Sequence, residues 1–158
     1  MKYINFSDGP TLSQDEFFMQ EALKEARKAL ELDEVPIGAV IVHNGRIIGR
    51  GHNLTEQLND VTAHAEMQAF TAAANYTGGK YLKDCILYVT IEPCVMCAGA
   101  SYWTQISKIV FAAHDSKRGF SLIRERIIHP RTEVLSGIMA NDAAQLMKDF
   151  FISKRNKS

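Results

Sequence analysis

The sequence lacks the features that would point to a membrane or secreted protein. It contains no apolar run approaching the roughly 20 residues that a transmembrane helix needs. The opening residues, MKYINFSDGP, have neither the basic start nor the apolar core of a secretory signal. The three cysteines are few and odd in number, which argues against a disulfide framework. We therefore expect a cytoplasmic protein with no membrane partner.

Net charge is absent as well, since 18 basic residues balance 18 acidic ones. The charges are nevertheless unevenly distributed, because residues 115–158 carry nine basic and five acidic side chains, a net charge of +4. Residues 1–114 carry the compensating charge of −4. A basic C-terminal third is compatible with a phosphate-bearing substrate, and also with an ordinary solvated helix surface.

What is present is the composition of a globular protein. Hydrophobic residues make up 46% of the 158 positions, which predicts one domain, residues 1–158, with a sizeable core. Residues 1–12 show no periodicity and are expected to form a loose arm. Ser13 and Glu16 then form a capping box, which predicts the start of a helix. Met19 lies on the apolar stripe of that helix and is expected in the core.

The next segments predict a mixed sheet. Asn44-Gly45 separates two β-rich runs and predicts a type I′ hairpin. Gly38, in the first run, either relieves crowding or lets a ligand approach the backbone. A later strand-helix-strand unit should cross over right-handed, so that its strands are parallel. The expected elements are strands at 37–43, 46–51, 85–90, 108–113 and 132–135, a helix over 62–75 with Thr62 near its cap, a helix holding Cys94 and Cys97, a short helix over 121–128, and a final helix capped by Asn141.

The strongest chemical signal is the pair Cys94 and Cys97, three residues apart after an apolar strand. A helix places both thiols on one face, Pro93 suits its first turn, and its positive N-terminus favours thiolate over thiol. The pair therefore has metal-ligand spacing. A CxxC pair can also carry redox chemistry, but that motif normally stands alone, whereas His64-Ala65-Glu66 accompanies this one. Cys85 starts the preceding strand and is expected to be a small core residue.

His64 is the best-placed third ligand, because it would sit in the first turn of another helix. With His64, Cys94 and Cys97 bound, one tetrahedral zinc per chain keeps a position for water, as catalytic zinc sites do. Glu66 could exchange protons with that water. The alternative is a structural zinc module that binds RNA or protein and has a fourth protein ligand. The other histidines are expected to be ordinary surface or hydrogen-bonded residues, although any could close such a site: His43, His52, His114 and His129.

These motifs carry a resemblance to a known family. His64-Ala65-Glu66 with Pro93-Cys94-Val95-Met96-Cys97 resembles the H-x-E and P-C-x-x-C signature of the zinc-dependent nucleobase deaminases. The similarity extends over roughly residues 17–151 to the bacterial tRNA adenosine deaminases within the cytidine and deoxycytidylate deaminase superfamily. It includes residues 34–40 (EVPIGAV), Asn53 after Gly51-His52, residues 62–66 (TAHAE) and residues 87–100 (LYVTIEPCVMCAGA).

The resemblance implies a three-layer α/β/α, cytidine-deaminase-like fold with a mixed central sheet of about five strands. It implies hydrolytic conversion of adenosine to inosine at the wobble position of a tRNA anticodon loop, by a homodimer that uses zinc. Glu66 would be catalytic, carrying protons to the ring nitrogen and to the departing amine. The ligand and substrate contacts that it implies are His64, Cys94 and Cys97 for zinc, and Asn53, Pro36, Ala65 and Asp115 for the substrate.

Other members of the superfamily keep an alternative substrate open. Residues 85–88 and the pair Tyr102-Trp103 also resemble bacterial guanine deaminases, and free cytosine deaminases share the Val-Pro-Ile-Gly and His-x-Glu pieces. The sequence has His129-Pro130-Arg131 where the tRNA enzymes usually carry a longer loop. A free purine or pyrimidine base is therefore the second candidate substrate. Trp103 is expected to pack in the core or at a subunit interface rather than to stack on the substrate.

Overall fold

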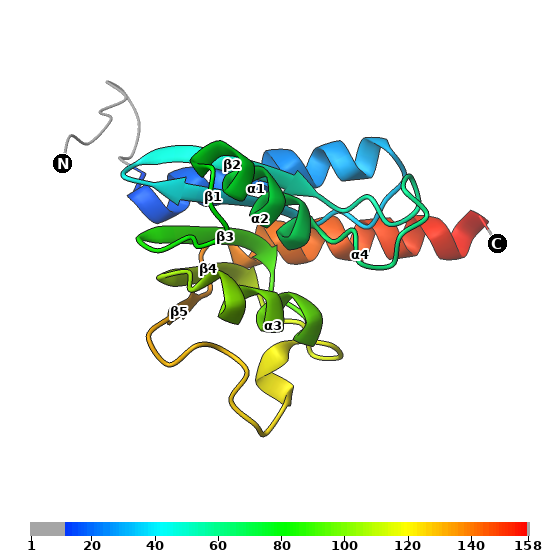
Figure 1. Ribbon diagram of the computed structural model, residues 1–158. Helices are drawn as coiled ribbons and strands as arrows, with labels where there is room; N and C mark the ends of the chain where they lie inside the picture. The colour runs from blue at the N-terminus through cyan, green and yellow to red at the C-terminus, as the bar shows by residue number, and fades with distance from the viewer. Residues whose placement is uncertain (1–11, 158) are drawn as a thin grey trace.

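A five-stranded mixed sheet forms the centre of the computed structural model, which describes residues 12–157 (Figure 1). The strand order is β2-β1-β3-β4-β5, with β1 antiparallel to β2 and β3, and with β3, β4 and β5 parallel. The predicted mixed sheet is confirmed. Apart from Leu12, the expected N-terminal arm lies outside the described residues. The strands are β1 (Gly38–His43), β2 (Arg46–His52), β3 (Cys85–Ile91), β4 (Lys108–Ala113) and β5 (Glu133–Ser136).

Helices cover both faces of the sheet. Helices α1 (Gln14–Glu31) and α4 (Ala140–Lys157) lie behind it in Figure 1, and α2 (Ala65–Thr77) and α3 (Val95–Thr104) lie in front. This arrangement confirms the three-layer α/β/α prediction. Over residues 12–157, none of the helices combines the length and apolarity that crossing a membrane requires.

The core is divided by the sheet into two apolar clusters. Successive residues of a strand point to opposite faces, so Ile41 packs toward α2 while its neighbours Val40 and Val42 pack toward α1. Met19 is fully buried in the second cluster and Cys85 is buried in the first, as expected from the sequence. The interior that supports the site is therefore apolar on both sides.

Two local predictions are confirmed. The Glu16 N–H donates to Ser13 Oγ at 3.1 Å, so Ser13 caps α1. The Glu16 carboxylate accepts from the Ser13 hydroxyl rather than from a backbone N–H, so only one half of the expected capping box forms. Asn44 and Gly45 have φ values of 50° and 73°, which is the backbone of a type I′ hairpin.

Gly38 lies where β1 meets the backbone of α1. A Cβ at this position would lie 2.1 Å from the Ala22 carbonyl oxygen and 2.3 Å from the Ala26 nitrogen. Such distances are far below van der Waals contact, so no side chain fits. Of the two roles considered for Gly38, the structure supports the relief of crowding, and the crowding element is a helix.

Three predicted boundaries or elements are wrong. Residues 121–128 do not form a helix, because only the short 3₁₀ turn η1 (Phe120–Leu122) is present. Only the end of the segment reaches the core, where Ile128 is buried, whereas Leu122 and Ile123 are exposed, so a helix over these residues would have little to pack against. Asn141 lies inside α4 rather than at its cap, since the helix begins at Ala140. Helix α2 begins at Ala65 rather than at Thr62, whose N–H and hydroxyl both donate to the Asp60 carboxylate in the preceding turn.

Candidate metal centre

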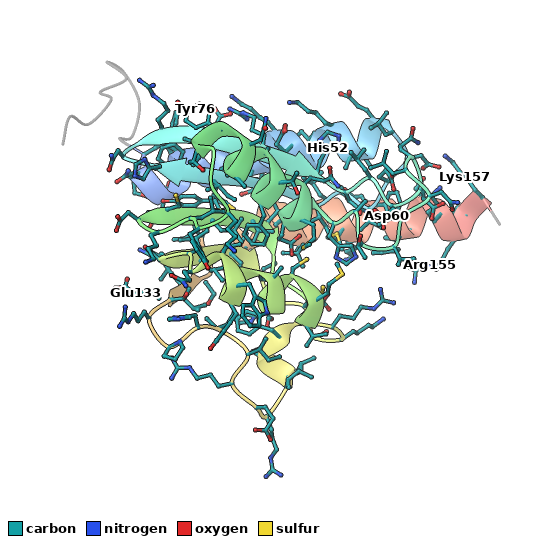
Figure 2. The ribbon with its side chains drawn as sticks, viewed as in Figure 1. His52, Asp60, Tyr76, Glu133, Arg155 and Lys157 are labelled. Atoms are coloured by element: carbon teal, nitrogen blue, oxygen red, sulfur yellow. The ribbon has the colours of Figure 1, made fainter. Side chains whose placement is uncertain are left out.

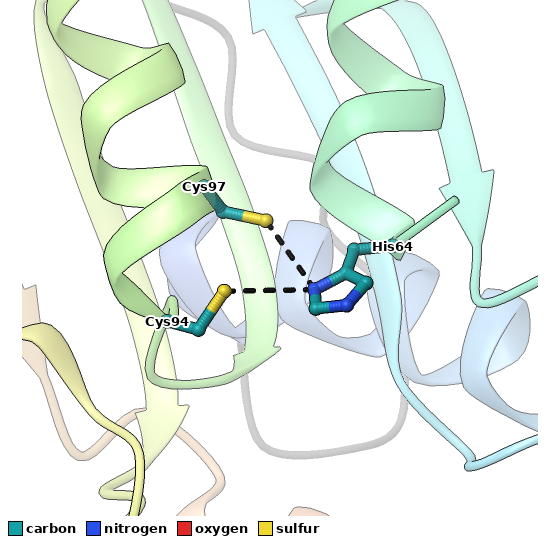
Figure 3. Close-up of side chains that lie close together, drawn as sticks. All are labelled: His64, Cys94 and Cys97. Atoms are coloured by element: carbon teal, nitrogen blue, oxygen red, sulfur yellow. Dashed lines mark hydrogen bonds between the residues drawn. The ribbon is translucent and has the colours of Figure 1, made fainter. Parts of the chain in front are cut away.

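Two helix starts supply the candidate metal ligands. His64 is the N-cap of α2 and Cys94 is the N-cap of α3, which places Pro93 before the helix rather than in its first turn. Both cap residues have extended backbone, and neither side chain makes a capping hydrogen bond to its own helix. Their side chains instead turn toward each other and toward Cys97, one turn along α3 (Figure 3).

The three donor atoms have the spacing of a tetrahedral zinc site. Cys94 Sγ and Cys97 Sγ each lie 3.6 Å from His64 Nδ1. Sulfur at about 2.3 Å and nitrogen at about 2.1 Å from a tetrahedral zinc would be separated by roughly 3.6 Å. The donor atoms all lie within 4.8 Å of one another, and over residues 12–157 no fourth histidine, cysteine or carboxylate belongs to this group. Three protein donors of this kind are typical of catalytic rather than structural zinc.

Hydrogen bonds among the donors prepare them for a cation. The Cys97 thiol donates to Cys94, which lowers the pKa of Cys94 to about 4, and His64 acts in the same direction. The same contact raises the pKa of Cys97, and contact with the Cys94 sulfur raises the pKa of His64. The lowered pKa favours the thiolate form of Cys94, with Cys97 and His64 as the groups that stabilise it. A metal cation would displace protons from the donors, because metal ligands bind in their deprotonated forms.

Glu66 lies in the first turn of α2, beside the donors, and is 4% exposed. Burial raises the pKa of its carboxyl to about 7, and the negative charge of Cys94 adds to this effect. A carboxyl group with such a pKa can both accept and donate a proton near neutral pH. The first turn of α2 lies close to β2 because Gly51 has no side chain, and a Cβ there would lie 2.2 Å from the Ala65 carbonyl oxygen.

The predicted substrate residues lie in two places. Asn53 follows β2, is 6% exposed, and donates its backbone N–H to the Ile37 carbonyl at 3.2 Å, next to the buried Pro36. The Asn53 side-chain amide makes no hydrogen bond to any residue that the structure describes. Ala65 is fully buried at the start of α2. Asp115 lies in a separate loop after β4, where one carboxylate oxygen accepts the N–H groups of Lys117 and Arg118.

Two buried glutamates hold the loops around the site, and sequence reasoning gave neither a role. Glu34 accepts the N–H groups of Glu56 and Gln57, at 2.9–3.1 Å, in the loop that leads toward His64. Glu92 anchors the loop that contains Asp115. A glutamate one or two residues before a proline, next to an apolar strand, is the signal that could have identified both, since a buried carboxylate needs hydrogen-bond donors.

The remaining histidines do not join the donor cluster. The His114 ring contacts the Glu92 carboxylate at 3.1 Å, and His129 Nδ1 accepts the N–H of Arg131 at 3.1 Å. His52 Nδ1 lies 3.9 Å from the Glu25 carboxylate. None of these residues, nor His43, belongs to the metal group formed within residues 12–157. The structure therefore gives no support to a closed structural zinc site.

The chain matches known deaminases in sequence. A family model described as the cytidine and deoxycytidylate deaminase zinc-binding region matches residues 12–113. A tRNA-specific adenosine deaminase of Bacillus subtilis (strain 168) is 44% identical over 151 residues, which cover 92% of this chain and 94% of that protein.

Solved structures of two kinds of deaminase share the fold. One comes from a study of A-to-I editing by tRNA:A34 deaminases at the wobble position of transfer RNA. It is 42% identical, with a TM-score of 0.77, and the match covers 82% of this chain and 98% of that one. A guanine deaminase from Bacillus subtilis is 38% identical, with a TM-score of 0.62, and the match covers 73% of this chain and 77% of that one.

Proposed function

Since the chain belongs to the cytidine and deoxycytidylate deaminase zinc-binding family, we propose that it converts adenosine to inosine at the wobble position of a tRNA anticodon. The observation that carries the choice of substrate is the match to the tRNA:A34 deaminase, which covers 98% of that chain with a TM-score of 0.77. The guanine deaminase is matched over 77% of its length with a TM-score of 0.62. An anticodon loop also presents unpaired bases, so no duplex has to be opened.

In the proposed mechanism His64, Cys94 and Cys97 would hold the zinc ion. Bound zinc lowers the pKa of water from near 16 toward about 7 and so supplies a nucleophile at neutral pH. Glu66 accepts the proton of the attacking water and delivers it to the ring nitrogen beside the attacked carbon. It then accepts the remaining proton of the added hydroxyl, which becomes the carbonyl, and delivers that proton to the departing amine, which leaves as ammonia. Its raised pKa suits a group that must both accept and donate.

The substrate contacts are proposed from their positions around this centre. Asn53 is nearly buried, and its amide has no partner among residues 12–157, so it is available to hydrogen-bond a nucleoside. Pro36 and Ala65 would line the same pocket beside the base. Asp115 would act from the loop after β4, where its carboxylate already shapes the turn.

The basic end of α4 supports a phosphate-bearing substrate. Lys154 pairs with Asp33 at 2.5 Å, and the Gln57 side chain donates to the backbone carbonyl of the residue before Asp33. The end of α4 and the loop over 54–60 therefore lie at the same end of the molecule, as Figure 2 shows for Asp60, Arg155 and Lys157. That loop leads directly to His64. A tRNA backbone could thus contact α4 while its anticodon occupies the site, and a tRNA substrate favours action in the cytoplasm.

A homodimer is the proposed assembly. Trp103 is 76% exposed and Val95 is 53% exposed on α3, so the expectation of core packing for Trp103 is wrong within one chain. Large exposed apolar side chains commonly mark subunit contacts. In sedimentation velocity experiments, Trp103→Glu should shift the protein toward monomer, whereas Tyr76→Glu, at a side chain 59% exposed on α2, should not. A wild-type protein that sediments as a monomer would exclude the dimer.

Ammonia release from a panel of substrates tests the proposed activity. The panel contains an anticodon stem-loop RNA with adenosine at the wobble position, the same RNA with guanosine there, and free guanine, cytosine and cytidine. We expect ammonia from the first RNA alone. Turnover of free guanine without turnover of RNA would instead establish the guanine deaminase alternative, which the 38% identity to that enzyme makes the second candidate.

A further inference from the structure

Glu92, the last residue before Pro93 and Cys94, holds a whole loop through one carboxylate. Its side chain is 1% exposed. Oε1 accepts the Asp115 N–H at 3.2 Å and contacts His114 Nδ1 at 3.1 Å. Oε2 accepts the Ser121 N–H at 2.9 Å. The two oxygens therefore receive donors from both ends of the segment 114–121.

The same loop is closed onto the cysteine turn by backbone contacts. The Phe120 N–H donates to the Pro93 carbonyl at 3.0 Å, and Cys94 forms a β-bridge with Gly119. The Glu92 carboxylate occupies the space beside Gly119, where a Cβ would lie 2.3 Å from Glu92 Cδ. The loop therefore has room to close on the turn only because residue 119 is glycine.

We propose that Glu92 is a positioning residue for the reaction, because it fixes segment 114–121, and with it Asp115, against the metal-binding turn. The Glu92 carboxylate itself is turned into the loop, where it contacts His114, Asp115 and Ser121. Its effect on turnover rests on the proposed function, in which Asp115 lines the substrate pocket. The metal turn keeps its own backbone contacts, so loss of Glu92 should loosen the substrate loop and leave the zinc in place.

Replacement by glutamine tests this arrangement with little change in shape. A carboxylate offers only acceptors, whereas a glutamine has one oxygen and one NH₂ group. If the oxygen faces Asp115, the NH₂ group faces the Ser121 N–H, and two donors meet. If the amide is flipped, the NH₂ group meets the Asp115 N–H instead. Either orientation releases one end of the loop.

The experiment compares zinc-loaded wild type, Glu92→Gln, Gly119→Ala and the control Tyr88→Phe. In the control, Tyr88 loses its 2.7 Å hydrogen bond to Asp15 on the opposite side of the sheet. Amide hydrogen exchange over 114–121 should accelerate at least roughly tenfold in Glu92→Gln and Gly119→Ala. An unpaired buried donor destabilises the closed loop by enough to raise the population of its open form about tenfold. The exchange of α2 and the zinc content should stay as in wild type.

Kinetics on the stem-loop RNA provide the functional readout. Glu92→Gln and Gly119→Ala should raise KM roughly tenfold while kcat changes less than about threefold, because the loop holds substrate in the ground and transition states alike. Tyr88→Phe should leave both constants unchanged. Unchanged exchange in the loop, or loss of zinc and kcat together, would overturn the role of Glu92. A wild type that does not deaminate the RNA would refute the proposed function, and loop exchange would still decide the positioning claim.

Discussion

Substitution of Gly38 by alanine tests how closely β1 lies against α1. The added Cβ would lie 2.1 Å from the Ala22 carbonyl oxygen and 2.3 Å from the Ala26 nitrogen. Both contacts are to backbone atoms of a helix, which cannot turn aside as a flexible side chain could. The helix and strand must therefore separate, and the packing beneath them is lost.

The expected cost follows from the overpacking of a close-packed core. Forced methyl groups typically cost about 1–3 kcal/mol, and we expect about 3 kcal/mol here because only backbone movement relieves the contact. For a chain of this size each kcal/mol lowers the Tm by about 2–4 °C, so the loss should be about 6–12 °C. Gly79→Ala is the matched control, because nothing lies within 4 Å of its Cβ position. Its Tm should stay within about 2 °C of wild type.

Thermal unfolding of the zinc-loaded proteins, followed by circular dichroism, measures both variants. If Gly38→Ala had the Tm of Gly79→Ala, the packing argument would be refuted. If Gly38→Ala left the Tm unchanged but raised KM, the other role considered for Gly38 would be supported, in which a ligand lies close to its backbone.

Three further outcomes are expected. Glu66→Gln should keep one zinc per chain but lower kcat roughly 10²–10⁴-fold, and wild-type turnover in this variant would remove Glu66 from the mechanism. Cys97→Ala should contain no zinc in elemental analysis after desalting, whereas Cys85→Ala, at a buried cysteine outside the donor cluster, should keep it. Equal zinc content in the two variants would show that Cys97 is not a zinc ligand. Glu34→Ala deprives the Glu56 N–H of its acceptor and should lower the free energy of unfolding, measured with denaturant, by about 2 kcal/mol. An unchanged denaturation midpoint would show that water replaces the carboxylate.

The parts of the fold that could be predicted are those fixed by local chemistry. Asn44-Gly45 predicts its hairpin because both residues must adopt positive φ, and no distant residue is needed. Cys94 and Cys97 could be paired because three-residue spacing on a helix brings thiols together. That His64 joins them could be inferred from its place at another helix start and from the resemblance, since 30 residues separate it from Cys94 and no local rule brings the two together.

The failures have tertiary causes. Residues 121–128 contain apolar side chains at helical spacing, but the fold gives Leu122 and Ile123 nothing to pack against. Helix starts were missed by one to three residues because contacts outside the helix decide them. Thr62 is bonded to Asp60 in the preceding turn, and His64 and Cys94 stand at their caps without a side-chain hydrogen bond to the helix. The contacts of Glu92 could not be predicted because its partners lie 22 to 29 residues along the chain, in the loop after β4 and in η1.

Sequencing by mass spectrometry of a single tRNA tests the central claim most directly. An unmodified tRNA whose anticodon begins with adenosine is incubated with the zinc-loaded protein and digested to fragments. The account predicts one inosine, at the wobble position, and no change at other adenosines. A tRNA that keeps its wobble adenosine while the same protein releases ammonia from free guanine or cytosine would contradict it.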